Sequence, residues 1–271
     1  MYNYCHLIIK ILMSLLALIC NRISKLIGNM SKVLIGYPFH FFWPKKRFTI
    51  PKYSKAFVQG KKQIVPKKIW QTNYTNKVSL PVYLNYLFNR LMSLSYDYHY
   101  VSTEDRLVFI QENSATDIVK AYQRLNDGAA QADLWRLLVL QHFGGIYLDI
   151  DAHLVFPLSG IINKTDRELF ILKGNSNTHT NYFIASQANH SILEKAIEII
   201  LANINSNKIV GVFSLTGPVP FSDAIKQSKL SVNDKSYRYV CIQGDFTNEY
   251  FQYIDKPRGK WTHKKPSEIL K

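Results

Sequence analysis

The sequence predicts an α/β fold in which helices cover a Rossmann-like sheet. Between residues 67 and 151, short segments with the two-residue period of strands alternate with longer segments that have helical spacing. The longest helical segment, residues 129–143, contains no glycine or proline and ends at a glycine pair. Of the 271 residues, 47% are hydrophobic, which is enough for one large domain with a substantial core.

The first 36 residues predict a membrane-associating helix. Residues 6–20 are mostly apolar, and Arg22, Lys25 and Lys32 follow among further apolar side chains. This stretch is shorter than the ~20 residues that span a bilayer, whereas a basic amphipathic helix binds the surface of an anionic membrane. A buried helix that caps the domain is the alternative.

The order of charged and apolar residues also indicates the compartment. A secretory signal peptide has its positive charges before the apolar stretch, whereas here most of them follow it. If the segment spanned a membrane, the positive-inside rule would keep residues 21 onward in the cytoplasm. The three cysteines form no C-x-x-C pair and fit a reducing compartment. We therefore expect a cytoplasmic, peripheral protein on the inner face of a bacterial plasma membrane.

Residues 37–64 predict a linker, and residues 65–271 a single domain. In the linker, the aromatic residues 41–43 precede a basic cluster at 44–47, which suits a membrane interface or a strap packed on the core. The chain has 34 Lys and Arg against 19 Asp and Glu, a net charge of +15 that favours anionic partners. It contains no helix-turn-helix, zinc-finger or RRM signature, so we expect no nucleic-acid partner.

The predicted elements of the domain alternate along the chain. Apolar residues at the period of a strand predict strands at 67–72, 96–101, 146–150, 170–173 and 182–185. Helical spacing of apolar side chains predicts helices at 81–94, 107–111, 115–125, 129–143 and 193–204. Ligands of such sheets bind beyond the carboxyl ends of the strands, where Trp70, Ser102 and Asp149 are expected to lie.

Two acidic residues stand at the end of the third of these strands. Alternation with the aliphatic residues of the strand places Asp149 and Asp151 on one face. Neighbouring carboxylates repel unless a cation lies beside them, and their oxygens suit Mg²⁺ or Mn²⁺, which bridge carboxylates to phosphates. On the preceding helix, Asp133 and Arg136 share a face and can hold hydroxyl and anionic groups. The alternatives are an exposed acidic pair and an ordinary ion pair within the helix.

The stretch from Ala132 to Asp151 contains the pattern A-D-x-x-R, a helix, and G-G-x-Y-x-D-x-D. It resembles the DXD-type sugar transferases of glycosyltransferase family 32, which include capsule-synthesis enzymes, yeast initiating mannosyltransferases and clostridial glucosylating toxins. Further similarity lies upstream and downstream, at residues 65–72, 96–102, 181–185 and 216–218. The resemblance implies a GT-A-type, Rossmann-like domain that binds a nucleotide sugar.

The resemblance also implies a role for each side chain of this stretch. Asp151 would bind a Mn²⁺ or Mg²⁺ ion that holds the donor diphosphate. Asp149 would contact the ribose or sugar of the donor and reach the metal through water. Asp133 and Arg136 would hold hydroxyls of the transferred sugar, and Tyr147 would line the donor pocket. The catalytic group implied in this way consists of Asp133, Arg136, Asp149 and Asp151.

Two other stretches would complete the site. Trp70 would stack on the uracil or guanine ring of a UDP- or GDP-sugar, with Gln71 beside it. Near the C-terminus, His263 would be a third metal ligand, and Lys264 and Lys265 would close over the diphosphate. A solvated basic tail is the alternative for these last three residues.

The expected function is metal-dependent transfer of a sugar from a nucleotide sugar, with retention of configuration. The acceptor would be a glycan or a polyprenyl-diphosphate-linked oligosaccharide at an anionic membrane, in the synthesis of a capsular or other surface polysaccharide. One alternative is a toxin-like glycosyltransferase that modifies a protein. Another is a non-enzymatic membrane-docking protein with a vestigial donor pocket, although a decayed site would lose its acidic residues first.

Overall fold

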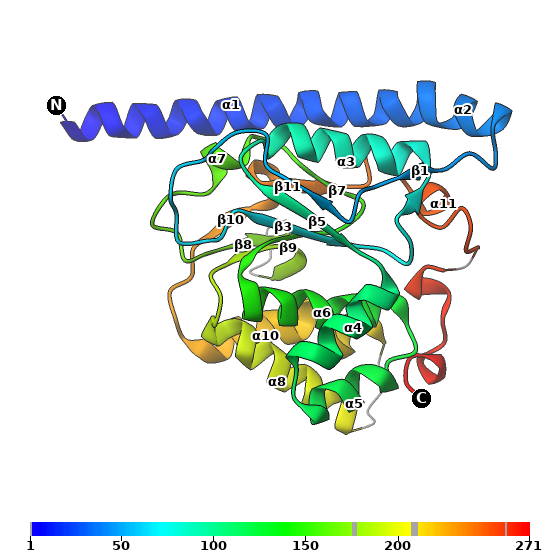
Figure 1. Ribbon diagram of the computed structural model, residues 1–271. Helices are drawn as coiled ribbons and strands as arrows, with labels where there is room; N and C mark the ends of the chain where they lie inside the picture. The colour runs from blue at the N-terminus through cyan, green and yellow to red at the C-terminus, as the bar shows by residue number, and fades with distance from the viewer. Residues whose placement is uncertain (1, 175–177, 207–210, 258) are drawn as a thin grey trace.

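A seven-stranded sheet forms the centre of the protein, with helices on both of its faces (Figure 1). The computed structural model describes residues 2–174, 178–206, 211–257 and 259–271, with side chains from residue 11 onward. The five strands predicted from the sequence all lie in this sheet. In spatial order its strands are β10 (Asp234–Ser236), β8 (Glu168–Leu172), β9 (His179–Ser186), β6 (Gly145–Leu148), β3 (Lys68–Thr72), β5 (Asp97–Val101) and β2 (Tyr53–Ser54).

The sheet is mixed, whereas a Rossmann-like sheet would be largely parallel. Its parallel centre consists of β5, β3 and β6. Next to them, β9 runs antiparallel to both β6 and β8. A short loop joins β8 to β9, and so short a connection can join antiparallel neighbours but not parallel ones.

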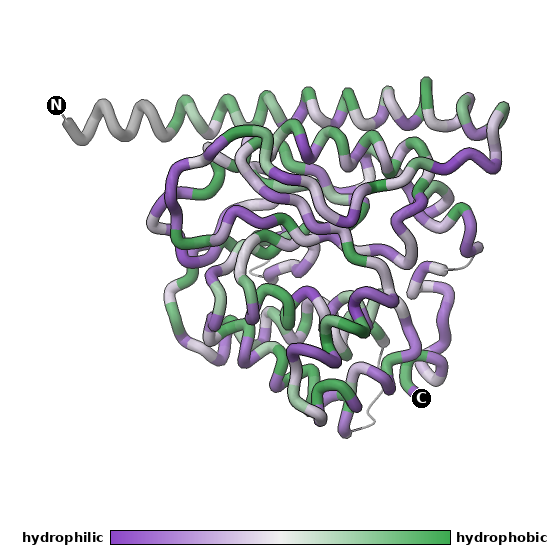
Figure 2. Tube along the Cα trace, in the orientation of Figure 1, coloured by the Kyte–Doolittle hydropathy of each residue, from purple (hydrophilic) through white to green (hydrophobic). Residues whose placement is uncertain are grey.

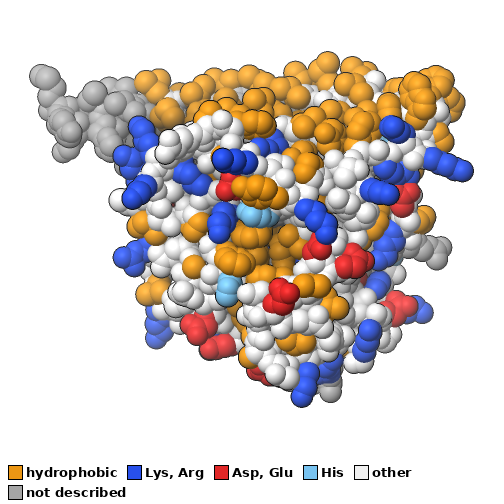
Figure 3. All heavy atoms as spheres, in the orientation of Figure 1, with side chains coloured by type: hydrophobic (Ala, Val, Ile, Leu, Met, Phe, Trp, Pro, Cys, Tyr) orange, Lys and Arg blue, Asp and Glu red, His pale blue; other side chains and the backbone are white. Residues whose placement is uncertain are grey.

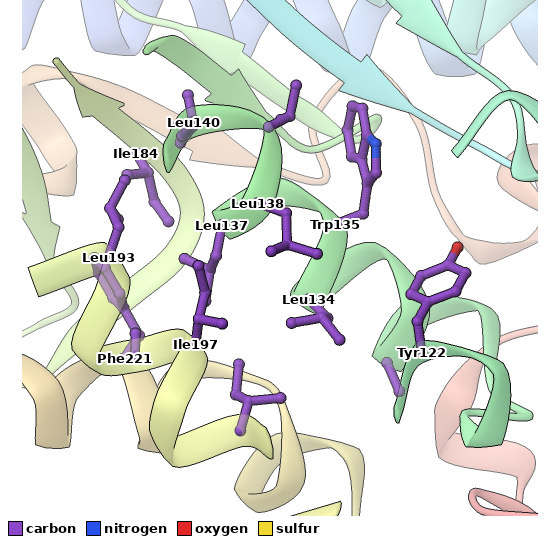
Figure 4. Packing of buried hydrophobic residues seen from close by; sticks show 14 of the residues in the cluster. Tyr122, Leu134, Trp135, Leu137, Leu138, Leu140, Ile184, Leu193, Ile197 and Phe221 are labelled. Carbon is purple, nitrogen blue, oxygen red and sulfur yellow. The ribbon is translucent and has the colours of Figure 1, made fainter. Parts of the chain in front are cut away.

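One face of the sheet is covered by a layer of helices that contains the larger hydrophobic core. At its centre, Leu134 and Leu137 of α6 lie in one cluster with Leu193 and Ile197 of α8 (Figure 4). The side chain of Asp127 accepts hydrogen bonds from the first turn of α6, as expected of a helix N-cap. The helices of this layer are α4 (Thr103–Asn113), α5 (Thr116–Arg124), α6 (Gly128–Phe143), α8 (Ser191–Asn205), α9 (Val212–Leu215) and α10 (Pro218–Ser228).

The opposite face is covered by α3 (Leu80–Met92) and by several short elements. Among them, β7 and β11 pair antiparallel and bring Gln243 opposite Ala152. Gln243 therefore lies next to the turn that contains Asp149 and Asp151, which we call the acidic turn. The short elements are β1 (Phe48–Thr49), β4 (Lys77–Val78), β7 (Ala152–Leu154), α7 (Leu158–Ile161), β11 (Cys241–Gln243), α11 (Glu249–Gln252) and a 3₁₀ turn (Tyr237–Tyr239). Two further 3₁₀ turns (Trp261–His263 and Pro266–Glu268) lie beside the first layer, where Leu270 pairs with Leu125 after α5.

A single long helix at the N-terminus lies across this second layer (Figure 1). The helix α1 (Tyr2–Met30) continues through a π-helical segment, η1 (Ser31–Gly36), into α2 (Tyr37–Phe42). The helix therefore extends beyond residue 36. The predicted linker, residues 37–64, also contains β1 and β2, and β2 pairs with β5 at the edge of the main sheet. This stretch accordingly folds together with the domain.

Polar side chains attach the inner side of this helix to the domain. Asn21 donates to the carbonyl of Arg238 (2.7 Å), Ser24 hydrogen-bonds His153 (3.3 Å), Asn29 donates to Asp245 (2.9 Å) and Lys32 donates to the carbonyl of Gly244 (2.9 Å). This side of the helix therefore packs on the domain, although the helix as a whole is not the buried helix of the alternative, because most of its residues are exposed.

The outer side of the same helix is apolar and exposed. Among the described helices, Ile11–Phe42 is long and apolar enough to cross a membrane by length and composition. Figure 2 shows hydrophobic residues along this helix, and Figure 3 shows hydrophobic side chains along the outer edge of the molecule. We call this surface the apolar belt; its exposed members include Ile11, Leu12, Leu15, Leu16, Ile19, Ile23, Leu26, Ile27, Met30, Val33, Leu34, Phe41 and Phe42.

Candidate active site

A pocket of about 710 Å³ opens where β3 and β6 end. Its walls come from the turns after these strands, the first half of α6, the strand β9 and the C-terminal segment. This volume falls within the range of small-molecule sites. Five of the residues predicted for the site line it together: Asp133, Arg136, Tyr147, Asp149 and Asp151.

Asp149 and Asp151 lie in a turn rather than on a strand. The strand β6 ends at Leu148 and is buried on both faces, so the alternation inferred from the sequence does not apply to the two acids. The carboxylates still lie close together, because Gln243 donates to both, at 3.2 Å to Asp149 and 3.0 Å to Asp151. The predicted pair is therefore correct, but a tight turn and a distant amide produce it.

Asp133 and Arg136 form a buried network below the acidic turn. Arg136 contacts Asp133 at 2.9 Å and Asp149 at 3.2 Å, and donates to the carbonyl of Asn181 at 2.7 Å. Asp133 also accepts from the Asn181 amide (2.9 Å) and the Thr216 hydroxyl (3.1 Å). The pair is thus more than an ion pair within α6, since it links that helix to β9 and to the start of α10.

Tyr147 completes this network from β6. Its hydroxyl donates to Asp149 at 2.7 Å, and the guanidinium of Arg136 lies 4.3 Å from the centre of its ring. The ring of Tyr147 thus packs against Arg136 while its hydroxyl group orients the carboxylate of Asp149. The side chain of Tyr147 is itself buried.

The charges of the site perturb one another strongly. Burial raises the pKa of Asp133 to about 6, against the opposing effect of Arg136. Burial and the nearby Asp149 raise the pKa of Asp151 to about 6, and burial raises the pKa of Asp149 as well. Burial alone would lower the pKa of Arg136, but Asp149, Tyr147 and Asp133 outweigh it and keep the guanidinium charged.

The residues of the acidic turn fit a divalent cation. Two carboxylates that face the same amide repel each other, and a cation beside them would relieve that repulsion. Mg²⁺ commonly takes only one or two protein carboxylates and completes its coordination with water and substrate phosphates. Asp149 and Asp151 supply this set of ligands.

His263 does not join these two acids. Among the described residues, no group of three His, Cys, Asp or Glu side chains lies close enough together to hold a metal ion. The imidazole of His263 instead hydrogen-bonds Glu249 on the exposed side of the C-terminal segment. The prediction of His263 as a third metal ligand is therefore wrong, because its turn directs it towards α11.

Trp70 and Gln71 do not line the pocket either. Trp70 is 7% exposed, lies against His99 and Phe143, and donates to the carbonyl of Gly144 (2.9 Å). It belongs to the core because it lies in the middle of β3, two residues before the end of the strand. Gln71 is buried and donates to the carbonyl of Asp149 (3.0 Å), so it supports the backbone of the acidic turn from below.

Two tyrosines, rather than Trp70, present aromatic rings to the pocket. Tyr74 follows β3 and Tyr253 follows α11, and both line the pocket. Their rings are nearly parallel, with 6.3 Å between centroids. The sequence hinted at Tyr74, which is the first aromatic residue after the strand, but nothing near Tyr253 in the sequence indicated a pocket.

The C-terminal segment contributes positive charge to the same pocket. Lys256, Lys260 and Lys264 line it together with Trp261. Lys264 donates to the carbonyl of Asn126 (2.8 Å), which attaches the segment to the start of α6. Lys264 therefore lines the pocket and Lys265 does not, and contact of either residue with a diphosphate stays a prediction.

Comparison with known proteins agrees with this geometry. A family model described as "Glycosyltransferase sugar-binding region containing DXD motif" matches residues 81–168. An initiation-specific alpha-1,6-mannosyltransferase of Candida albicans is 30% identical over 139 residues, which are 46% of this chain and 36% of that protein. Toxin Afp18 of Yersinia ruckeri is 32% identical over 107 residues, 36% of this chain and 5% of the toxin.

Among solved structures, the PaToxG glycosyltransferase has a similar fold. Its TM-score is 0.51 at 19% identity, with 76% of this chain and 80% of that chain covered. The resemblance to DXD-type glycosyltransferases is thereby confirmed, and the mixed α/β fold is one found in a glycosyltransferase domain. The chain spans about a third of the length of the mannosyltransferase and a small part of the toxin.

Proposed function

We propose that this protein is a metal-dependent glycosyltransferase with a GT-A-type domain at residues 65–271. It transfers a sugar from a UDP- or GDP-sugar, with retention of configuration, in the presence of Mn²⁺ or Mg²⁺. The observation that carries this proposal is the convergence of Asp133, Arg136, Asp149 and Asp151 on the wall of one large pocket. The match to a DXD sugar-binding region over the same residues supports it.

The side chains of the pocket suit the departure of a charged leaving group. When the bond between the anomeric carbon and the diphosphate breaks, the nucleoside diphosphate leaves with negative charge. Asp149 and Asp151 would hold a divalent cation, which would supply positive charge to stabilise the departing diphosphate. Lys256 and Lys260 line the same pocket and add positive charge around the phosphates.

Asp133 and Arg136 suit the binding of sugar hydroxyls. Both oxygens of Asp133 already accept hydrogen bonds, from Asn181 and Thr216. A carboxylate held in this way is oriented for one further hydroxyl donor, and it is a poor nucleophile. We therefore assign Asp133 to positioning the sugar and name no covalent nucleophile.

We further propose that the acceptor is lipid-linked and that the enzyme works at a membrane surface. The apolar belt supports this, since contiguous exposed apolar surface of this length marks an interaction site. The helix lies against the domain through Asn21, Asn29 and Lys32. While these contacts hold, it lies in the plane of the interface and does not cross the bilayer. The location proposed with this acceptor is the cytoplasmic face of a bacterial plasma membrane, in the synthesis of a surface polysaccharide.

A protein acceptor is the second candidate. This chain is similar to part of toxin Afp18, and its fold is similar to that of the PaToxG glycosyltransferase. An enzyme of that kind would glycosylate a protein in solution and would need no lipid.

The proposed activity can be tested by a screen of nucleotide sugars. The full-length protein should hydrolyse one UDP- or GDP-sugar slowly in the presence of Mn²⁺, and the rate should fall to background in EDTA. Full turnover in EDTA, or the absence of binding to every nucleotide sugar tested, would contradict the proposal. With the active donor, transfer to a polyprenyl-diphosphate oligosaccharide rather than to protein would separate the two acceptors.

A further inference from the structure

A second hollow lies at the end of the N-terminal helix, outside the donor pocket. It measures about 700 Å³ and is lined by side chains of η1, α2 and α11. We call it the α2 groove. Its lining is mostly aliphatic and aromatic and includes Val33, Tyr37, Phe41, Phe42 and Tyr250.

The α2 groove is continuous with the apolar belt. Val33, Phe41 and Phe42 belong to both, and Phe41 is 80% exposed. Two exposed phenylalanines at the end of an apolar helix are typical of a segment in contact with lipid. A molecule that enters the groove can therefore come from the membrane without crossing water.

A single short helix separates the α2 groove from the donor pocket. In α11, Tyr250 lines the groove, whereas Gln252 and the following Tyr253 line the pocket. Each residue turns a helix by about 100°, so the side chains of Tyr250 and Gln252 point to opposite sides and the two hollows lie on either side of α11. The hydroxyl of Tyr37 accepts from Asn248 (2.7 Å) and holds this helix against α2.

Positive charge lies along the path between the two hollows. Lys45 and Lys46 follow α2 and are exposed. Arg47 makes a bidentate contact with Asp255, at 2.6 Å for each bond, next to Lys256 of the donor pocket. Lys45, Lys46 and Lys256 are the basic side chains that an anionic head group would meet there, whereas the charge of Arg47 is balanced by Asp255.

We propose that the α2 groove binds the apolar chain of the acceptor, a long-chain lipid whose diphosphate carries the sugar to be extended. The chain lies between Phe41 and Tyr250 and continues into the membrane along the apolar belt. Its diphosphate reaches the basic residues 45–47, and the glycan enters the donor pocket beside α11. This inference deepens the proposed function and rests on it, because it assigns the acceptor of the same site.

Photo-crosslinking in vesicles tests this assignment. The full-length protein is bound to phosphatidylcholine vesicles that contain a polyprenyl diphosphate with a diazirine on its chain. After irradiation, the labelled peptides should include α11, which contributes Tyr250 but is not part of the belt. Tyr250→Asp should lower labelling several-fold while binding to the vesicles stays the same. The matched control, Leu34→Asp, lies on the belt outside the groove and should weaken vesicle binding without changing labelling per bound protein.

Three results would overturn the assignment. In the first, a diazirine phosphatidylcholine labels α11 as strongly as the polyprenyl diphosphate does, so that the groove takes ordinary lipid. In the second, label is confined to residues 11–36 and Tyr250→Asp has no effect. In the third, crosslinks join two protein chains through Tyr250, so that a second copy of this chain fills the groove.

A further variant separates this inference from the proposed function. Asp151→Asn removes a proposed metal ligand that does not line the groove, so it should abolish sugar transfer and leave lipid labelling intact. If the wild-type protein binds no nucleotide sugar but Tyr250 is still needed for labelling, the glycosyltransferase proposal fails and the lipid site stands. If transfer to lipid occurs and Tyr250→Asp does not affect it, the groove assignment fails alone.

Discussion

The carboxylates of Asp149 and Asp151 differ in the contacts that they make with other side chains of the protein. Asp149 accepts from Tyr147, contacts Arg136 and shares Gln243 with Asp151. Asp151 has the weaker set of contacts and a pKa raised to about 6 by burial and by Asp149. Asp151 is therefore the acid that gains most from a cation, and Asp149 is the acid whose position the protein fixes.

This difference predicts a metal-specific effect of Asp151→Asn. The variant removes repulsion from the acidic turn, so its thermal midpoint without metal should equal or exceed that of the wild type. The increase in midpoint that Mn²⁺ gives the wild-type protein through linkage should disappear. Thermal unfolding with and without Mn²⁺ measures both, and Asp117→Asn on the exposed surface of α5 is the control. An undiminished Mn²⁺ effect in Asp151→Asn would place the metal elsewhere.

Tyr74 rather than Trp70 is predicted to stack on the nucleotide base. Tyr74→Ala should weaken the binding of the nucleoside diphosphate by about 1–3 kcal/mol, the usual value of a base–aromatic stack. Trp70→Phe removes the hydrogen bond to Gly144 from the core, so it should lower the free energy of unfolding and leave affinity unchanged. Isothermal calorimetry measures the affinity of both folded variants for the nucleoside diphosphate. If Trp70→Phe weakens binding and Tyr74→Ala does not, Trp70 is the residue that stacks on the base.

The sequence predicted the local part of the site and missed the distant part. Asp133, Arg136, Tyr147 and Asp149 lie within one short stretch, whose pattern was enough to place them together. Gln243 reaches the acidic turn through the pairing of β11 with β7, and no local pattern encodes that pairing. Trp70 was misplaced for a related reason, since the spacing of a strand does not reveal which of its residues extends beyond the sheet.

At the scale of elements, local signals located five helices and five strands, but they gave neither all of the boundaries nor the direction of the strands. The predicted helix at 107–111, for example, is α4, which spans Thr103–Asn113. The helix α6 ends where Gly144 and Gly145 take positive φ values, as the glycine pair predicts. The antiparallel placement of β9 depends on its pairing with β6 and β8. The lengths of the connections and the long-range pairing decide that placement, so the mixed sheet was not visible in the sequence.

Of the two glycines that follow α6, Gly145 is predicted to tolerate substitution less well. Its φ is +110°, and a Cβ atom would lie 2.6 Å from the carbonyl oxygen of Lys68. Gly145→Ala should therefore cost about 1–3 kcal/mol of stability through backbone strain alone. Gly128→Ala at the other end of α6 is the control, since a Cβ there meets nothing within 4 Å. Urea unfolding of both variants measures the difference in stability. If the two variants are equally stable, an alanine at position 145 causes no measurable backbone strain.

The docking of α2 is predicted to weaken in acid through His40. Its Nε2 accepts from the backbone N–H of Leu80 (3.0 Å), which requires the neutral ring. Burial and Arg47 lower the pKa of His40 from 6.5, against the opposing effect of Asp255. The unfolded chain therefore binds a proton more readily, so this contribution to stability is complete above pH 6.5 and is lost as the pH falls below it.

His40→Gln tests this dependence, because an amide oxygen can accept from Leu80 and does not titrate. The free energy of unfolding is measured above and below pH 6.5 for both proteins. The wild type should lose more stability than the variant over that interval. Parallel pH profiles would show that His40 does not carry the effect.

On the scale of the whole molecule, one helix presents two different surfaces. Its inner side hydrogen-bonds to the domain at Asn21, Asn29 and Lys32, and its outer side carries the apolar belt. Lys32 was expected to face anionic lipid, but its ammonium group binds the carbonyl of Gly244. Binding to a membrane would accordingly depend on apolar contact more than on the three basic residues identified in the sequence.

The last prediction follows from this division. Leu12 and Leu34 are 59% and 62% exposed, so the double variant Leu12→Asp, Leu34→Asp should fold with an unchanged thermal midpoint. Burial of a leucine side chain contributes about 1.5–3 kcal/mol, and the variant should thus lose at least tenfold in affinity for phosphatidylglycerol vesicles in a flotation assay. Val108→Asp, on α4 in the opposite layer, should bind as the wild type does. The membrane proposal fails if the wild type does not bind vesicles, or if Val108→Asp weakens binding as much as the double variant does. Sugar transfer at the acidic turn is tested separately by the screen of nucleotide sugars.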